Sequence, residues 1–167
     1  MNFLIKFFAT GGGVSLLPYY FRSTQTHTGA GLFGTLLAWA LLPLLPGSPF
    51  FQGIFLLLFL LLSVWVSGKA ERLLQSHDDP RIVIDEIIGY WITMAFLPRI
   101  LWVTLLGVLL FRLFDVWKPG PIRRLGELPG GWGVVMDDVL AGIFANLLLQ
   151  AVLYGAQINF ATIQTRF

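Results

Sequence analysis

The segment from Phe50 to Ser67, FFQGIFLLLFLLLSVWVS, contains no charged side chain and leaves the chain few ways to fold. An α-helix rises about 1.5 Å per residue, so this segment nearly reaches the ~30 Å thickness of a bilayer's hydrocarbon core. The whole chain is 56% hydrophobic and only 12% charged, whereas a soluble domain carries about 25% charged residues. Because a soluble core cannot hide so much apolar surface, we expect an integral membrane protein partly covered by lipid.

Four further apolar stretches occupy Leu32–Leu45, Pro80–Leu97, Ile100–Val116 and Trp132–Gln157. Their apolar residues do not alternate with polar ones, which favours helices over membrane strands. Most of them are close to spanning length, and the first is short enough to be tilted or re-entrant. The expected fold is therefore all-α: a polytopic membrane helix bundle of about four to five apolar helices, in one membrane-embedded domain over residues 1–167.

Two local patterns refine the expected helix boundaries. Asp79 followed by Pro80 is typical of a helix N-cap with proline at the first helical position. Residues 2–20 contain three consecutive glycines, Gly11 to Gly13. We therefore expect an interfacial helix there, broken at the glycines.

The charged residues are unevenly placed along this path. If successive helices cross in opposite directions, residues 1–31, 68–81 and 112–131 share one side. Nine of the eleven basic residues fall on that side, against Arg99 and Arg166 opposite. The positive-inside rule makes it the cytoplasmic side. All nine acidic residues lie there too, although acids have little weight in topology, so their gathering indicates a site at that membrane face.

Two adjacent acidic pairs, Asp85–Glu86 and Asp137–Asp138, lie inside apolar stretches. A carboxylate at such a depth is costly and usually faces a polar cavity or a cation. The chain has no cysteine and two histidines, so an all-oxygen ligand set is expected, which suits a hard cation such as Mg²⁺. We therefore predict a Mg²⁺ site on these four residues. Glycines four residues beyond Asp85 and Asp138 predict close helix approach on those faces.

The stretch FRLFDVWKPGPIRR supplies cations for phosphate. Arg112 and Asp115 are three residues apart and so share a helical face. We expect Arg112 and Lys118 to bind phosphate, and Asp115 to hold metal or orient a base. Arg123 and Arg124 are interpreted as headgroup anchors. Two glycine-rich helix starts are further phosphate candidates, through Thr35 in GLFGT and through Gly130 and Gly131 in GGWG, and His77 is a candidate for proton transfer.

At these motifs the sequence resembles the phosphatidylglycerophosphatase A family. Three ordered blocks carry the resemblance: His77, Asp79, Ile82, Val83, Asp85 and Glu86; Phe111, Arg112, Asp115, Trp117, Lys118 and Pro119; and Gly130, Gly131, Gly133, Asp137, Asp138, Ala141 and Gly142. The resemblance implies a Mg²⁺-dependent lipid phosphatase in a bacterial inner membrane. Such an enzyme converts phosphatidylglycerophosphate to phosphatidylglycerol and phosphate.

The chain departs from the family pattern at four positions, with Ala30 for Pro, Leu32 for Thr, Pro129 for His and Gly120 for Trp. The catalytic set expected from the matched blocks is Asp85, Glu86, Asp115, Lys118, Asp137 and Asp138. Attack by water and a covalent carboxyl-phosphate intermediate both remain open, as does the oligomeric state.

Two other functions fit the same composition: a metal-dependent phosphotransferase of the CDP-alcohol type, and a small cation transporter that uses buried carboxylates. The first lacks its Asp-Gly-x-x-Ala-Arg block, since Val139 follows Asp138. The second is disfavoured because the acids gather at one face. We expect no nucleic-acid partner, because a net charge of +2 without a basic run does not suggest one.

Overall fold

The computed structural model describes residues 2–18, 29–76 and 78–155. Within these ranges every regular element is helical, which confirms the all-α prediction. The elements in chain order are α1 (Asn2–Ala9), the 3-10 turn η1 (Val14–Leu16), α3 (Ala30–Ala40), the 3-10 turn η2 (Leu42–Leu44), α4 (Pro49–Leu74), α5 (Ile84–Thr93), α6 (Leu101–Trp117), α7 (Gly120–Gly126) and α8 (Gly131–Gly155).

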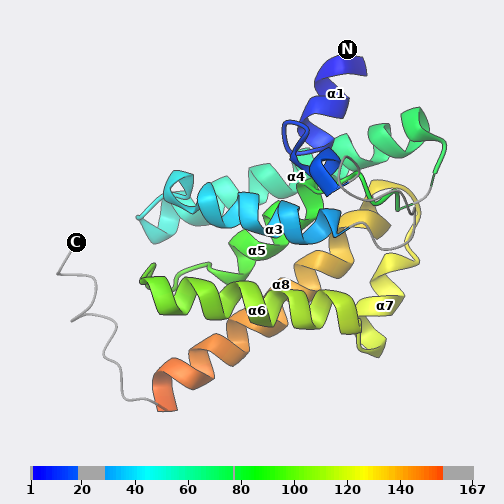
Figure 1. The fold of residues 1–167 in the computed structure, drawn as a ribbon. Helices are drawn as coiled ribbons and strands as arrows, with labels where there is room; N and C mark the ends of the chain where they lie inside the picture. The colour runs from blue at the N-terminus through cyan, green and yellow to red at the C-terminus, as the bar shows by residue number, and fades with distance from the viewer. Residues whose placement is uncertain (1, 19–28, 77, 156–167) are drawn as a thin grey trace.

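The longer helices run back and forth along one common direction (Figure 1). α3, α5 and α8 begin at the end of the bundle where α4 and α6 finish, and α7 lies at that same end. We call it the charged end; it contains Ala30, Leu74, Ile84, Trp117 and Gly131. This alternation is the path that the sequence predicted.

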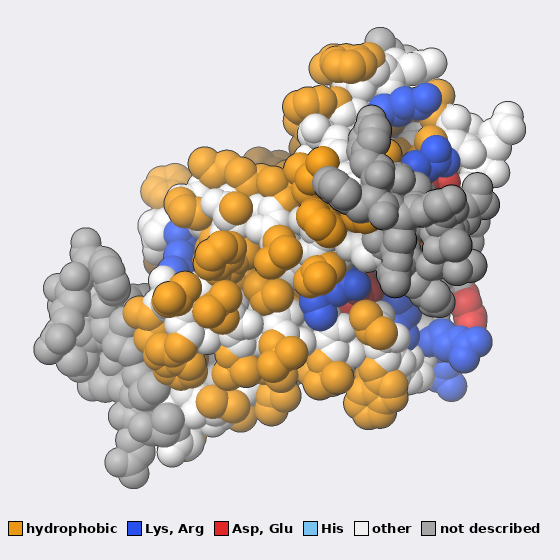
Figure 2. Space-filling model, viewed as in Figure 1, with side chains coloured by type: hydrophobic (Ala, Val, Ile, Leu, Met, Phe, Trp, Pro, Cys, Tyr) orange, Lys and Arg blue, Asp and Glu red, His pale blue; other side chains and the backbone are white. Residues whose placement is uncertain are grey.

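Charged side chains follow this path. Lys and Arg side chains gather mainly at the charged end in Figure 2. At the opposite end, the Arg99 guanidinium donates to the carbonyl oxygens of Leu45 at 2.6 Å and Pro46 at 2.7 Å. Arg22 and Arg166, which we also assigned to sides, lie outside the described residues.

Two of the described helices are long and apolar enough to cross a membrane, namely α4 with 26 residues and α8 with 25. In its most apolar window α4 is only 22% buried against the rest of the chain. Leucines and phenylalanines therefore cover its outer side, and Figure 2 shows hydrophobic side chains spread over the visible flank of the bundle. α3 is apolar but shorter, and α6 has 17 residues.

α5 corrects two predictions for the Pro80–Leu97 stretch. The helix has only 10 residues, about 15 Å at 1.5 Å per residue, and is too short to cross a bilayer. It is buried on nearly every side, because α3, α4, α6 and α8 all pack against it. Its apolar residues thus reflect an interior position.

The predicted cap at Asp79 is also wrong, because α5 begins at Ile84 with Val83 as its N-cap. Asp79 instead accepts hydrogen bonds from the backbone N–H of Arg81 at 3.0 Å and from its guanidinium at 2.7 Å. The Arg81 guanidinium, aided by this backbone bond, holds the pKa of Asp79 below its usual value despite burial. Asp79 therefore stabilises the turn that leads into α5.

Glycines bring α5 and α8 together, as their spacing from the acidic residues predicted. A Cβ atom built on Gly142 would collide with the carbonyl oxygen of Gly89. A Cβ atom on Gly89 would lie 2.9 Å from the carbonyl oxygen of Asp138. The backbones are thus in direct contact one turn beyond the acidic residues of both helices.

Candidate metal and phosphate site

Three carboxylates meet at the charged end of the bundle. Asp85 and Glu86 come from the first turn of α5 and Asp138 from the second turn of α8. One oxygen atom from each residue lies within 4.8 Å of the others. Asp85 and Asp138 are buried, and Glu86 is largely shielded from solvent. Three carboxylates so close in a region of low polarity repel one another strongly unless a cation or protons lie between them.

Neighbouring acids on one helix point in different directions, because successive residues are rotated by about 100°. In the pair 137–138, Asp138 faces α5 while Asp137 turns toward α7, where Gly126 lies beside it. The Asp137 Oδ1 atom accepts the Asp138 backbone N–H at 3.0 Å. Likewise the Asp85 Oδ1 atom accepts the Glu86 N–H at 3.1 Å. Of the four predicted metal ligands, the structure brings three together and gives Asp137 a different neighbour.

That neighbour is Lys118, whose Nζ donates to the Asp137 Oδ2 atom at 2.6 Å. Lys118 follows α6 in a left-handed conformation with φ of 44°, which directs the chain from α6 into α7. Burial lowers the pKa of the Lys118 amine, but attraction by Asp137, the hydrogen bond to it and the charges of Asp138 and Asp115 outweigh burial and raise that pKa above its ordinary value. The side chain is 36% exposed, so a charged ammonium borders the carboxylates and still reaches solvent.

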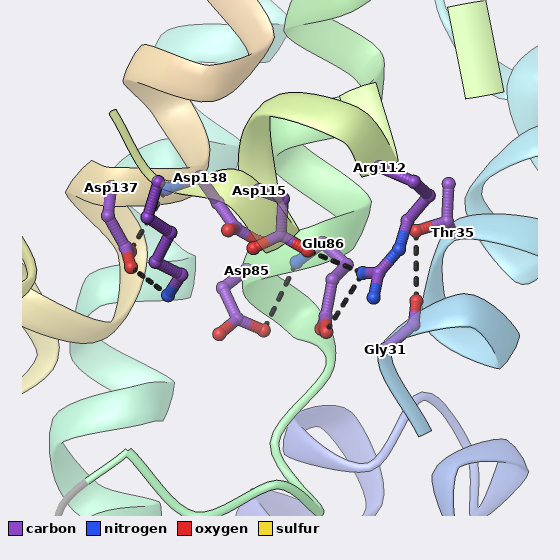
Figure 3. A network of polar contacts seen from close by, with 9 residues as sticks. Gly31, Thr35, Asp85, Glu86, Arg112, Asp115, Asp137 and Asp138 are labelled. Atoms are coloured by element: carbon purple, nitrogen blue, oxygen red, sulfur yellow. Dashed lines mark hydrogen bonds and ion pairs between the residues drawn. The ribbon is translucent and has the colours of Figure 1, made fainter. Parts of the chain in front are cut away.

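Arg112 links the other side of the cluster. Its Nη1 atom lies 2.6 Å from the Asp115 Oδ2 atom and 3.8 Å from the Glu86 Oε1 atom. The shared helical face predicted for Arg112 and Asp115 is therefore confirmed. Figure 3 shows Asp115 between Asp138 and Glu86, and its charge acts on both. The site is thus a row of carboxylates from α5, α6 and α8, bordered by two cations, Arg112 of α6 and Lys118 just after α6.

α3 packs against the Glu86 and Arg112 side chains. A Cβ atom on Gly31 would collide with the Glu86 Oε1 atom and lie 2.8 Å from the Arg112 Nη1 atom. A Cβ atom on Gly34 would lie 3.3 Å from the Glu86 Oε2 atom. Only glycine leaves room for the Glu86 carboxylate here. Both glycines lie in the GLFGT segment, where the sequence predicted a phosphate contact instead of this role. Their spacing of three residues, which places them on one helical face, was the available signal.

Other predicted phosphate contacts lie apart from this row or are engaged elsewhere. The Thr35 hydroxyl donates to the Gly31 carbonyl oxygen at 2.9 Å and is buried. Gly131 packs against α4, where a Cβ atom would meet the Gly68 nitrogen at 2.6 Å. Gly130 is exposed at the start of α8 with φ of 60°. His77, the proton-transfer candidate, lies outside the described residues.

The donor set fits a hard divalent cation. All three clustered donors are carboxylate oxygens, which Mg²⁺ prefers. The Glu86 Oε2 atom is buried and has no hydrogen-bond partner among the described residues. A buried carboxylate oxygen without a partner is costly, and a bound cation removes that cost.

Several known proteins are similar in sequence to this chain. The sequence is 38% identical over 147 residues to the phosphatidylglycerophosphatase A of Haemophilus influenzae, covering 84% of this chain and 89% of the relative. It is 33% identical over 139 residues to that of Escherichia coli, covering 80% of each. It is also 32% identical over 153 residues to a putative phosphatidylinositol-3-phosphatase of Bacteroides thetaiotaomicron, covering 89% of this chain and 92% of the relative.

No solved structure matches the chain. The family profile of phosphatidylglycerophosphatase A matches residues 7–153, which include all the residues of the carboxylate and cation row. The chain therefore belongs to the phosphatidylglycerophosphatase A family of phosphatases.

Proposed function

We propose that the protein hydrolyses phosphatidylglycerophosphate to phosphatidylglycerol and phosphate, with Mg²⁺ bound by Asp85, Glu86 and Asp138. The observation that carries this proposal is the meeting of these three carboxylates beside the Lys118–Asp137 pair, in a chain of this family. The CDP-alcohol phosphotransferase and the cation transporter gain no support from the relatives, which are named as phosphatases.

The reaction adds water to phosphorus and breaks the bond between phosphorus and the glycerol oxygen; the departing alkoxide takes up a proton. When bound, Mg²⁺ would neutralise part of the phosphate charge and polarise its oxygens. Lys118 presents a fixed ammonium to the phosphoryl group, and its contact with Asp137 holds it in place. Arg112 keeps Glu86 and Asp115 at their positions through its two ion pairs. These roles give Asp137 a positioning function in place of the metal-binding role expected from sequence.

The proposed setting is the bacterial inner membrane, with the charged end at the cytoplasmic face. α4 and α8 have the length to span and pack against each other, and the shorter α3, α5 and α6 complete the bundle beside them. The split of basic residues between the two ends supports this orientation. The headgroup phosphate of a lipid in the cytoplasmic leaflet would then lie level with the carboxylate row.

The relative named as a putative phosphatidylinositol-3-phosphatase supports a second substrate. Both named lipids present a phosphate monoester on a phospholipid headgroup, so one site suits either. Purified protein should therefore be given each lipid separately in mixed micelles with Mg²⁺, and phosphate release measured. We expect faster release from phosphatidylglycerophosphate and none in the presence of a chelator. Release from neither lipid, in protein that remains folded, would refute the proposal.

A further inference from the structure

The exposed face of α1 is strongly apolar although the helix lies at the charged end of the bundle. Phe3 is 76% exposed, Leu4 57%, Phe7 46% and Phe8 50%. At 100° per residue these four side chains form one continuous stripe along the helix, whereas Asn2 and Lys6 lie on another side. The rings of Phe3 and Phe7 stack with centroids 6.2 Å apart, which extends the stripe along the helix. Within the described residues no other element covers this stripe.

The opposite side of α1 is fixed to the protein. Ile5 and Ala9 are buried in a cluster with Val66 and Ala70 of α4 and with Ile82, Ile84 and Val134. α1 therefore lies in a defined orientation on α4. Figure 1 shows that it runs across the direction of α4, not along it. If α4 spans the bilayer, α1 lies close to the membrane plane at the level of the headgroups.

The end of α1 is bonded directly to the segment that precedes the carboxylates. The Ala9 carbonyl oxygen accepts the Val83 backbone N–H at 2.8 Å, and the buried Ser15 hydroxyl donates to the Arg81 carbonyl oxygen at 2.7 Å. Gly11, with φ of 57°, lets the chain turn against Val83, where a Cβ atom would lie 3.1 Å from the Val83 Cγ2 atom. Asp85 follows Val83 by two residues, so α1 and the turn after it support the start of α5.

We propose that α1 is an interfacial helix that inserts its phenylalanine stripe among lipid acyl chains and sets the height of the 81–86 segment relative to the headgroups. The stripe contacts the bilayer interface in this proposal, which three observations support. The stripe is apolar, and α1 runs across the direction of α4, as an interfacial helix would if α4 spans the bilayer (Figure 1). Lys6 is exposed beside the stripe and can be attracted by anionic headgroups. The inference rests on the proposed membrane setting. In this proposal, α1 holds the carboxylate row at the depth of the lipid substrate's phosphate.

The test exploits the absence of cysteine from the chain. Single variants Phe3→Cys, Phe7→Cys, Lys6→Cys and Leu58→Cys are labelled with an environment-sensitive fluorophore and reconstituted in vesicles of phosphatidylcholine and phosphatidylglycerol. Lipids with a nitroxide near the headgroup or near the acyl-chain terminus then report depth by quenching. Leu58 is exposed in the middle of α4 and is the control for the membrane setting.

We expect labels at Phe3 and Phe7 to be quenched most by the shallow nitroxide and the label at Leu58 most by the deep one. The label at Lys6 should be quenched by the shallow nitroxide less than those at Phe3 and Phe7. Deep quenching at Leu58 with unquenched, water-exposed labels at Phe3 and Phe7 would overturn the inference about α1 and leave the proposed membrane setting intact. Labels that are shielded from water yet unquenched by either lipid would show that a second copy covers the stripe, and would also overturn it. Absence of quenching at Leu58 would instead refute the membrane setting.

A kinetic measurement tests the coupling to the site. The double variant Phe3→Ser and Phe7→Ser should lower kcat/KM on vesicle-borne substrate about tenfold, because the helix no longer enters the interface. Its activity on a short-chain substrate, supplied below the critical micelle concentration of that lipid, should be unchanged. Equal losses on both substrates would show that α1 only stabilises the fold, and no loss on either would show that it has no part in reaching the lipid.

Discussion

Replacing Gly142 with alanine should separate the carboxylates of the site without touching any of them. Gly142 lies one turn after Asp138, and Gly89 lies one turn after Asp85. The added methyl group would collide with the Gly89 carbonyl oxygen and approach the Ile92 Cβ atom to 3.3 Å. Backbone atoms at such a contact cannot rotate away, so α8 must move from α5 by about 1 Å.

We expect the substitution to lower both the stability of the fold and the rate of the reaction. Overpacking of this kind destabilises a fold by roughly 1–3 kcal/mol. A displacement of about 1 Å at a catalytic centre lowers the rate by about a hundredfold. Because Asp138 moves with α8 while Asp85 and Glu86 stay with α5, we expect the concentration of Mg²⁺ needed for half-maximal activity to rise together with the loss in kcat.

The measurement is phosphate release from phosphatidylglycerophosphate as a function of Mg²⁺, with thermal unfolding in detergent followed in parallel. Gly53→Ala is the matched control, because Gly53 also lies in a helix and a Cβ atom there meets nothing within 4 Å. That variant should keep full activity and be unchanged or up to about 1 kcal/mol more stable, since alanine favours helix. Wild-type activity and Mg²⁺ dependence in Gly142→Ala would refute the role assigned to this helix contact.

Three other outcomes are expected. Lys118→Ala should lower kcat/KM about a hundredfold, the scale of one lost transition-state charge contact, whereas the exposed Arg124→Ala should change it little; equal losses would point to general membrane electrostatics. Asp85→Asn should abolish activity and weaken Mg²⁺ binding measured by calorimetry, while Asp78→Asn, outside the cluster, should have only a mild effect on both. Similar Mg²⁺ affinities for the two variants would show that Asp85 is not a metal ligand. A cysteine introduced within residues 120–128 should resist an impermeant reagent in intact cells, and one at Gly47 should react; the reverse pattern would invert the proposed topology.

Several features of the protein follow from its sequence alone. Long uncharged runs without alternation can only satisfy their backbone groups in lipid as helices, and every regular element among the described residues is a helix. The alternating path of those helices brings acids from distant segments to one end of the bundle. Some local contacts could also be predicted from the sequence. Arg112 and Asp115 pair as their spacing of three residues predicts, and Gly89 and Gly142 bring α5 and α8 into backbone contact.

The tertiary structure alone decided how these parts combine. Hydrophobicity did not reveal that α5 is a short interior helix, because burial by protein and burial by lipid select the same residues. The acidic pairs did not reveal which members converge, because that depends on the helix opposite each face. Asp138 faces α5 and joins Asp85 and Glu86, whereas Asp137 faces Lys118. Likewise, no local pattern links Ala9 to Val83, since a backbone hydrogen bond between distant segments is fixed only when their helices pack.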